Sequence, residues 1–319
     1  MRLIIFSTPF FKNCHKIEYH NIKKGSFNMA TFTNQAVLSY NGITTNSNIA
    51  TGEIVEVLSA TKEALSTEYE SDDTVTYVVS LVNSGSTPFT ALTLTDNLGA
   101  YTLSGSTGTV PGPRVVPLTY VPGSIRYYQN GVQQPAPTVT SGTELTVSNI
   151  GVPAGGNTIL VYQAKLNQFA NPGTTGTVTN TATIDGSEIS TPLTATAAIT
   201  SREAPYLTIL KSVSPRQVAE NGNITYTFDI QNLGNTAATA ADNVQITDTF
   251  NPALSNISVT YNGAVLPASS YTYDAATGEF STSAGAITVP AATYSQNPVT
   301  GAWTAVPGSA VLTVTGSIR

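Results

Sequence analysis

The segment that decides the fold lies at residues 75–85 and reads VTYVVSLVNSG. It recurs 149 residues further along the chain, where residues 224–234 read ITYTFDIQNLG. Both copies alternate apolar and polar side chains, which is the period of a half-buried β-strand, and both end in an Asn-x-Gly turn signal. The repetition predicts a tandem duplication of one all-β unit.

The two copies stay in register over much of their length. Lys62, near the first strand of the first copy, corresponds to Lys211 in the second at the same offset of 149 residues. Asn-Gly turns within residues 128–132 and 259–263 predict a matching hairpin in each copy. With about seven short strands per copy, separated by turn signals, the pattern is typical of an immunoglobulin-like β-sandwich.

The composition of the 319-residue chain excludes two kinds of partner. Only 10% of the residues are charged and the net charge is −6, so no basic stripe is present that could neutralise the phosphates of a nucleic acid. No apolar run approaches the roughly 20 residues that cross a bilayer. We therefore expect neither nucleic acid nor a membrane as a partner.

The first 28 residues stand apart from the strand pattern. They contain the only cysteine, Cys14, both histidines and four of the seven lysines. Two interpretations stay open: upstream sequence translated in error, or a disordered leader. The apolar run at the start is short, and charged residues occupy the place of a cleavage site, so the segment is not a convincing secretory signal.

From Met29 onward the chain has no Cys and no His. Their absence excludes thiol nucleophiles, imidazole bases, disulfides, and the zinc or copper sites that these ligands build. We expect no metal and no cofactor. A durable surface protein of this composition would need a covalent staple other than a disulfide.

The two copies differ in their closing strand. The first copy continues into residues 178–186, VTNTATIDG, and a return strand at 193–200, whereas no such pair follows the second copy. A similar sequence, FTNQAVLSYNG, lies at residues 32–42, and its return strand at 49–51 aligns with residues 198–200. The chain thus carries a surplus closing hairpin ahead of its first domain and lacks one in its second.

We accordingly expect an all-β fold with two tandem immunoglobulin-like β-sandwich domains and an N-terminal β-hairpin extension. The leader at 1–28 precedes a donor hairpin at 29–53, a first domain at 54–201, and a second domain at 202–319 that lacks its closing strand.

The order of motifs resembles a known family. A lysine near the first strand, Thr-Tyr with Asn-x-Gly, then Thr-Asp, and finally Thr-Asn-x-Ala resembles the prokaryotic conserved repeat domain, domain of unknown function 11, over residues 54–186 and 207–319. The resemblance implies immunoglobulin-like modules of bacterial surface proteins. A Met-Ala-Thr-Phe-Thr-Asn start followed by two repeats is similar to proteins of the appendages on spores of anaerobic bacteria. It implies a spore-surface or extracellular appendage that is assembled in the mother cell, without a secretion signal.

The missing strand leads to a polymerisation hypothesis. An incomplete sandwich exposes an apolar groove and unpaired backbone groups, which a matching strand from another chain can cover by β-augmentation. Because donor and acceptor lie at opposite ends of the chain, the contact is heterologous and repeats into a filament. Two alternatives stay open: the hairpin folds back onto its own second domain, or that domain is complete and the hairpin is a capping extension.

A second hypothesis concerns covalent bonds. Some immunoglobulin-like adhesin domains join a lysine near the first strand to an asparagine on the last strand, assisted by a carboxylic acid. In the first domain the corresponding residues are Lys62 as nucleophile, Asn180 as electrophile and Asp96 as acid and base. Burial would leave the amine neutral and the acid protonated. The alternative is an ordinary surface ion pair.

The second domain has the lysine and the acid but no asparagine. Lys211 and Asp248 are present, and Asn34 in the surplus hairpin occupies the place that Asn180 takes in the first domain. We expect an intermolecular bond between Lys211 and Asn34.

The function expected from these features is a self-assembling structural subunit of a surface fibre. Its main partner is itself, with other spore-surface or cell-surface proteins as further partners, and its only chemistry is the autocatalytic bond, so it is not an enzyme. The alternative is a surface adhesin or carbohydrate-binding module with the domains as spacers. The tyrosines at alternate strand positions are expected to pack within the sheets.

Overall fold

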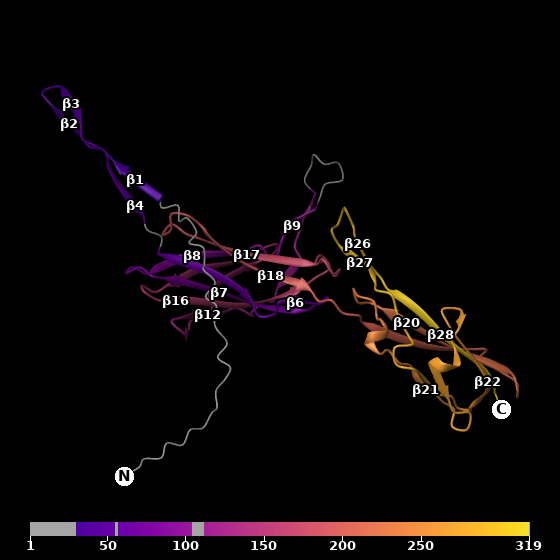
Figure 1. Cartoon of the computed structure of the whole chain (residues 1–319). Coiled ribbons are helices and arrows are strands. Elements are labelled where there is room, and N and C mark those ends of the chain that lie inside the picture. Colours follow the sequence, from indigo (N-terminus) through magenta and orange to yellow (C-terminus); the bar gives the residue numbers. More distant parts are fainter. Residues whose placement is uncertain (1–29, 55–56, 104–111, 319) are drawn as a thin grey trace, which may run out of the picture. The chain divides into compact units, whose positions relative to one another are not determined.

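The computed structural model of the protein describes residues 30–54, 57–103 and 112–318. These residues form two compact units, the first ending at Glu56 and the second beginning at Val57. Apart from two short 3-10 helices, the regular structure is extended throughout, which confirms the all-β prediction (Figure 1). The predicted leader at 1–28 lies outside the described residues.

The first unit is a long β-hairpin made of two antiparallel strand pairs, one after the other along its length. It is here called the arm. The turn residues Asn41 and Gly42 have φ angles of 46° and 79°, as expected for an Asn-Gly turn that follows the twist of the strands. Ser47 joins the two parts, since its hydroxyl accepts a hydrogen bond from the backbone of Ala36 at 2.9 Å. Each part is an antiparallel pair: β1 (Ala30–Asn34) with β4 (Ala50–Ile54), and β2 (Val37–Tyr40) with β3 (Ile43–Asn46).

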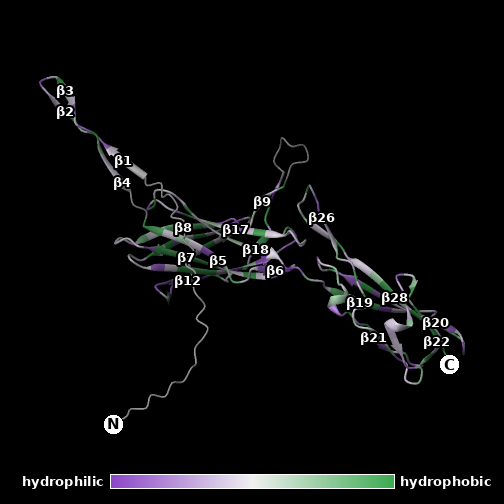
Figure 2. Cartoon of the chain, viewed as in Figure 1, coloured by the Kyte–Doolittle hydropathy of each residue, from purple (hydrophilic) through white to green (hydrophobic). Residues whose placement is uncertain are grey.

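The second unit contains two β-sandwiches, each with a hydrophobic core of its own. Inward and outward residues alternate along β7 (Thr74–Asn83), the strand that contains most of the duplicated segment 75–85, as the sequence predicts. Figure 2 shows hydrophobic residues along the strands of both sandwiches.

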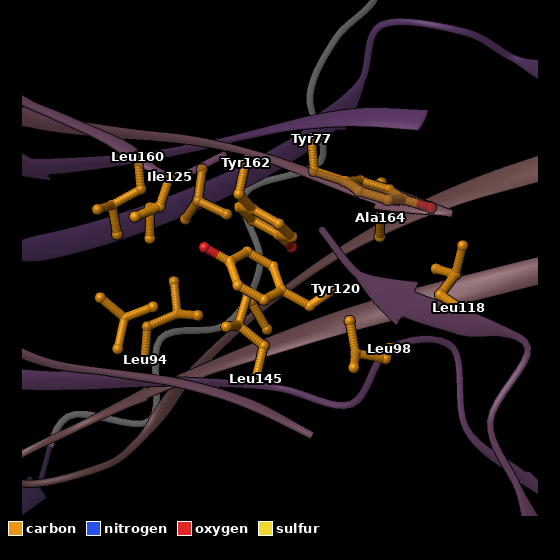
Figure 3. Close-up of a cluster of buried hydrophobic side chains, with 14 of the residues drawn as sticks. Tyr77, Leu94, Leu98, Leu118, Tyr120, Ile125, Leu145, Leu160, Tyr162 and Ala164 are labelled. Carbon is orange, nitrogen blue, oxygen red and sulfur yellow. The ribbon is translucent and has the colours of Figure 1, made fainter. Parts of the chain in front are cut away.

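The first sandwich consists of two six-stranded sheets. Tyr77 and Tyr162 stack in its core with ring centroids 5.7 Å apart, among the leucines drawn in Figure 3. One sheet has the order β13-β12-β16-β7-β5, with β11 beside β16; its strands are β5 (Leu58–Ala64), β7, β11 (Leu118–Tyr120), β12 (Arg126–Gln129), β13 (Val132–Gln133) and β16 (Asn157–Leu166). The other has the order β14-β15-β8-β17-β18-β6; its strands are β6 (Glu68–Tyr69), β8 (Phe89–Asp96), β14 (Thr138–Ser141), β15 (Leu145–Val152), β17 (Thr177–Asp185) and β18 (Leu193–Ser201). β9 (Tyr101–Thr102) and β10 (Arg114–Val115) form a separate two-stranded sheet.

The second sandwich repeats this plan with a smaller second sheet. Its first sheet has the order β19-β20-β28-β22-β23, from β19 (Leu207–Ser214), β20 (Asn223–Asn232), β22 (Leu254–Tyr261), β23 (Ala264–Val265) and β28 (Gly308–Ile318). Its second sheet has only three strands in the order β21-β25-β24, from β21 (Thr247–Thr249), β24 (Tyr271–Tyr273) and β25 (Glu279–Thr282). The hairpin of β26 (Thr293–Gln296) and β27 (Trp303–Val306) carries the only tryptophan of the sequence. The 3-10 helices are η1 (Ala240–Asp242) and η2 (Ala268–Ser270).

The two sandwiches differ at the strand β21. Its counterpart β8 lies between β15 and β17, whereas β21 pairs with β25 on one side alone among the described residues. The described part of the second sandwich therefore has no counterpart of the closing pair β17 and β18.

The return strand of the arm differs from its predicted alignment by two residues. Asn34 pairs with Ala50, as Asn180 pairs with Ala197, so Ala50 corresponds to Ala197 and not to Ile199. The predicted match rested on a run of three small or apolar residues, which is too short to determine the register. A shift of two leaves each side chain on its original face of the hairpin.

Core packing in the first sandwich can be tested with a pair of truncations. Leu160 is 1% exposed, so Leu160→Ala should lower the free energy of unfolding of this sandwich by about 2–5 kcal/mol. Val265, on a short edge strand, is 77% exposed, and Val265→Ala should change stability by no more than about 0.5 kcal/mol. Urea unfolding of both variants provides the measurement, and equal effects would contradict the assigned core.

Candidate functional site

The structure brings together the three residues predicted for the first domain. Lys62 lies on β5 in one sheet, while Asp96 at the end of β8 and Asn180 on β17 lie in the facing sheet. The Lys62 Nζ and Asp96 Oδ2 atoms are 2.5 Å apart. Asp96 pairs with Ala182, two residues beyond Asn180 on the same inward face of β17.

Burial controls the electrostatics of this pair. The side chains of Lys62 and Asp96 are both 0% exposed. Burial lowers the pKa of Lys62 from 10.5 to about 8, although the neighbouring Asp96 carboxylate opposes the shift. An amine with this pKa is neutral in a sizeable fraction of molecules at neutral or slightly alkaline pH, and the neutral amine is the nucleophilic form.

Two tyrosines complete the site, and sequence reasoning assigned them only to sheet packing. The Tyr162 hydroxyl donates a hydrogen bond to Asp96 Oδ2, and the Lys62 Nζ lies 4.9 Å from the centroid of the Tyr77 ring. Burial raises the pKa of both phenols, and the negative charge of Asp96 adds to the rise. A sequence signal for Tyr77 existed, because it lies in the duplicated segment and recurs as Tyr226.

Asn180 is the unusual member of the site. It is 0% exposed, and within the described part of the chain neither of its side-chain polar atoms has a hydrogen-bond partner of normal geometry. It is nevertheless close enough to Tyr77 and Tyr162 for its amide to oppose the rise of their pKa. A buried amide without partners costs roughly 1–3 kcal/mol, so its presence beside an amine and a carboxylic acid needs an explanation other than stability.

The second domain has the same lysine and acid in a wetter setting. Lys211 on β19 contacts Asp248 on β21 as predicted, but their side chains are 40% and 17% exposed. The Lys211 Nζ also faces three aromatic rings, at 4.7 Å from the centroid of Tyr226, 5.5 Å from Phe228 and 5.4 Å from Phe250. Such rings hold an ammonium group by cation–π attraction.

The closing strands that the described part of the second sandwich lacks explain the difference in exposure. In the first sandwich β18 contacts β5, and Ala60, two residues before Lys62, is partly buried against the core. On β19 the inward position Ile209, two residues before Lys211, is 56% exposed. Complete burial of an isoleucine side chain contributes about 1.5–3 kcal/mol, so the uncovered face of β19 is a substantial loss of stability.

Asn34 lies in the arm, on the same face of the β1–β4 pair as Phe32. Cross-strand partners share a face, so this face also carries Ala50 and Gly52, while Thr33 points to the opposite side. Phe32 is 56% exposed, although its ring lies over Gly52: a Cβ atom added to that glycine would be 2.3 Å from the ring. The arm therefore presents an amphipathic surface.

Other kinds of site lack support in the described residues. No group of three or more His, Cys, Asp or Glu side chains there could hold a metal ion. Nor does any described helix have the length and apolar character needed to cross a membrane.

Comparisons with known proteins find similarity in structure only. No family model matches the chain and no curated protein matches it, so the resemblance to the conserved repeat domain stays a prediction. Among solved structures, the chain is similar to the pilus backbone protein of Streptococcus pneumoniae (11% identity, 78% of this chain and 55% of that chain, TM-score 0.33). It is also similar to the major pilin subunit of Bacillus cereus (10%, 90% and 74%, 0.32) and to the collagen-binding domain of a Staphylococcus aureus adhesin (11%, 45% and 98%, 0.26). The chain spans about half the length of the first of these proteins.

The lowered pKa of Lys62 predicts a pH-dependent stability. In the variant Asn180→Ala the lysine keeps a free amine, with a pKa of about 8 in the folded state against 10.5 in the unfolded state. Between these two pKa values the folded state binds fewer protons than the unfolded state, so the free energy of unfolding rises with pH. Below both values the amine is protonated in both states, so this lysine causes no pH dependence there. Urea unfolding should show a rise of about 1–2 kcal/mol from about pH 7.5 to 9.5.

The control is the double variant Lys62→Met with Asn180→Ala, which should show no such rise. A rise of equal size in both variants would contradict the assignment to Lys62. The window ends below pH 10 because ionisation of unfolded tyrosine has the opposite effect, given the raised pKa of Tyr77 and Tyr162 in the folded state.

Proposed function

We propose that this protein is a structural subunit that assembles head to tail into a surface fibre, and that the arm of one copy completes the second sandwich of the next. The observation that carries the proposal is the edge of β21 and the nearby face of β19, which no other described strand covers. In the first sandwich the same place holds the closing pair β17 and β18.

The arm has the chemistry of that closing pair. Asn34 is preceded by Phe32 and followed by Ala36 on alternate positions, as Asn180 is preceded by Val178 and followed by Ala182. If Asn34 takes the place of Asn180, then Ala36 falls opposite Asp248, as Ala182 falls opposite Asp96. The match supports a single docking register.

One cross-strand pair of the arm fills about the same volume as the equivalent pair in the first sandwich. Val178 and Ile199 face each other across β17 and β18, and both are buried. In the arm the corresponding partners are Phe32 and Gly52. In the arm, the large Phe32 ring over Gly52 takes the place of the two medium-sized side chains of Val178 and Ile199. The total apolar volume is therefore similar, and this pair of residues can fill the same part of a sandwich core.

Docking would bury apolar side chains that are exposed on the arm and on β19 when the two are apart. Phe32 is 56% exposed in the arm and Ile209 is 56% exposed on β19. Burial contributes about 1.5–3 kcal/mol for each large apolar side chain, and strand pairing satisfies the backbone groups of the β21 edge. The two surfaces are different parts of one chain, so repetition of the contact gives an open polymer.

The proposed assembly includes covalent bonds. Within the first domain the neutral amine of Lys62 attacks the side-chain carbonyl carbon of Asn180. Asp96 then takes one proton from Nζ and delivers it to the amide nitrogen, which leaves as ammonia. The product is an amide between Lys62 and Asn180. By the loop-entropy account of cross-links it stabilises the domain by roughly 4–5 kcal/mol.

The same reaction is proposed between subunits. Lys211 and Asp248 supply the amine and the acid, and Asn34 of the docked arm supplies the amide. Arrival of the arm would cover a lysine that is 40% exposed, and this burial favours the neutral amine that reacts. Formation of the bond would therefore depend on docking.

A fibre subunit is favoured over a carbohydrate-binding module by the distribution of aromatic side chains. Among the described residues the large aromatic side chains that are exposed are Phe32, Tyr40 and Tyr206. Two of them lie on the arm, and the three do not form a platform on one sheet. We place the fibre on the outer surface of a cell or spore, with copies of the same chain as the main partner and no enzymatic role beyond the autocatalytic bond.

Assembly is tested by a charge placed on the arm. The variant Phe32→Asp would bring a carboxylate into an apolar groove, so electron microscopy of the purified protein should show single molecules in place of fibres. Val132→Asp is the matched control, because Val132 is 64% exposed on an edge strand of the first sandwich. Fibres formed by Phe32→Asp as readily as by the control would exclude the arm as the donor.

The bonds are tested by mass and by denaturing electrophoresis. Asn34→Ala should convert a ladder that survives boiling in detergent into a single band, while Asn48→Ala, elsewhere on the arm, keeps the ladder. The single band should have a mass about 17 Da below that of the sequence, since one ammonia is lost in the first domain. Lys62→Ala should remove this deficit and Lys165→Ala should not; a deficit that persists in Lys62→Ala would disprove the assignment.

A further inference from the structure

The hydroxyl of Tyr77 is a buried polar group that the proposed reaction leaves unused. Tyr77 is 0% exposed, and no described residue forms a hydrogen bond of normal geometry with its hydroxyl. An unpaired buried hydroxyl costs roughly 1–3 kcal/mol, which folding alone does not reward. Groups of this kind occur where a hydrogen bond is made only at a later stage, such as during a reaction.

Its neighbours are the reacting groups. The Nζ atom of Lys62 lies 4.9 Å from the Tyr77 ring centroid. Asn180, whose Oδ1 atom also lacks a partner among the described residues, is close enough to the Tyr77 hydroxyl to affect its pKa. The Tyr77 hydroxyl and the Asn180 amide group thus lie close together near the amine, and none of their polar atoms has a hydrogen-bond partner of normal geometry among the described residues.

The second phenol of the site cannot take the same role. The hydroxyl of Tyr162 already donates to Asp96. Tyr162 pairs with Tyr77, and in the second sandwich Val314 pairs with Tyr226, so the counterpart of Tyr162 has no hydroxyl. Tyr226 does correspond to Tyr77, and its ring centroid is 4.7 Å from Lys211 Nζ. The phenol that both lysine sites share is therefore that of Tyr77 and Tyr226.

We propose that Tyr77 is a catalytic residue of the cross-linking reaction, and that its hydroxyl donates a hydrogen bond to the amide oxygen of Asn180 as negative charge develops there. Tyr226 has the same role toward Asn34 of an incoming arm. The inference rests on the cross-link set out under the proposed function and adds the group that stabilises its intermediate.

The proposed step conserves both electrons and protons. The bond between Lys62 Nζ and Asn180 Cγ forms, and the π electron pair of the carbonyl moves to Oδ1, where the Tyr77 hydroxyl stabilises it. Asp96 carries a proton from Nζ to the amide nitrogen, the bond between Cγ and that nitrogen breaks, and ammonia leaves as the carbonyl re-forms. Tyr77 retains its proton throughout, since burial raises its pKa well above the ordinary value.

The test measures the rate of ammonia loss in the first domain. All chains carry Asn34→Ala, so that no bond forms between subunits. The full chain is made in a short pulse of cell-free synthesis, samples are quenched in acid at intervals, and the fraction lighter by about 17 Da is measured by intact mass. Tyr77→Phe keeps the ring and removes only the hydroxyl, and it should slow the loss by about 10²–10³-fold, the usual effect of removing one oxyanion donor.

Tyr120→Phe is the matched control, because Tyr120 is 6% exposed in the same core and should lose ammonia at the parent rate. A stability measurement separates catalysis from packing: in a Lys62→Ala background, Tyr77→Phe should leave the urea midpoint unchanged or raise it. The proposal is overturned if Tyr77→Phe reacts at the parent rate, or if its slower reaction comes with a lower midpoint. A parent chain that never loses ammonia would overturn the cross-link itself, and the role of Tyr77 with it.

Discussion

A β-sandwich is stable only if the inward faces of both sheets are covered, and this requirement determines how the molecule is organised. In the first sandwich β17 extends the sheet beyond β8, and β18 packs across from β5, so that Leu58 and Lys62 are both buried. In the second, the described residues leave the edge of β21 and the inward face of β19 uncovered. The proposed fibre follows from this constraint, because a second copy of the chain carries a hairpin of the required kind.

Covering the inward face of the first strand also makes the lysine on that strand reactive. A lysine that stays hydrated is a charged and unreactive ammonium group, and it becomes nucleophilic once water is excluded. Burial has lowered the pKa of Lys62 to about 8 beside the side chain of Asp96 and an amide that has no hydrogen-bond partner of normal geometry among the described residues. Lys211 still faces solvent and three aromatic rings. In the proposed fibre, completing the fold and activating the lysine are therefore one event.

The duplicated sequence predicted more of the fold than of the site. Alternation along residues 75–85 identified the inward faces, because the period of a strand is local, and the shared offset of Lys62 and Lys211 identified equivalent strands. The contact of Tyr162 with Asp96 joins residues 66 positions apart on facing sheets, and no local pattern encodes which side chains meet across a core. For the same reason the difference in exposure between the two lysines emerged only from the structure, since it depends on strands far away in the chain.

The identity of the chain that supplies Asn34 to Lys211 distinguishes a fibre from a molecule folded back on itself. Chains labelled with ¹⁴N or ¹⁵N are kept unfolded from synthesis onward so that no bond forms before mixing. Equal amounts are then mixed, refolded together and digested, and the masses of the peptides that contain both residues are measured. A bond between copies predicts that about half of these linked peptides combine one light and one heavy strand, as random pairing requires. Linked peptides in which both strands always carry the same label would show that the arm folds back onto its own chain, and the absence of linked peptides would show that the bond does not form.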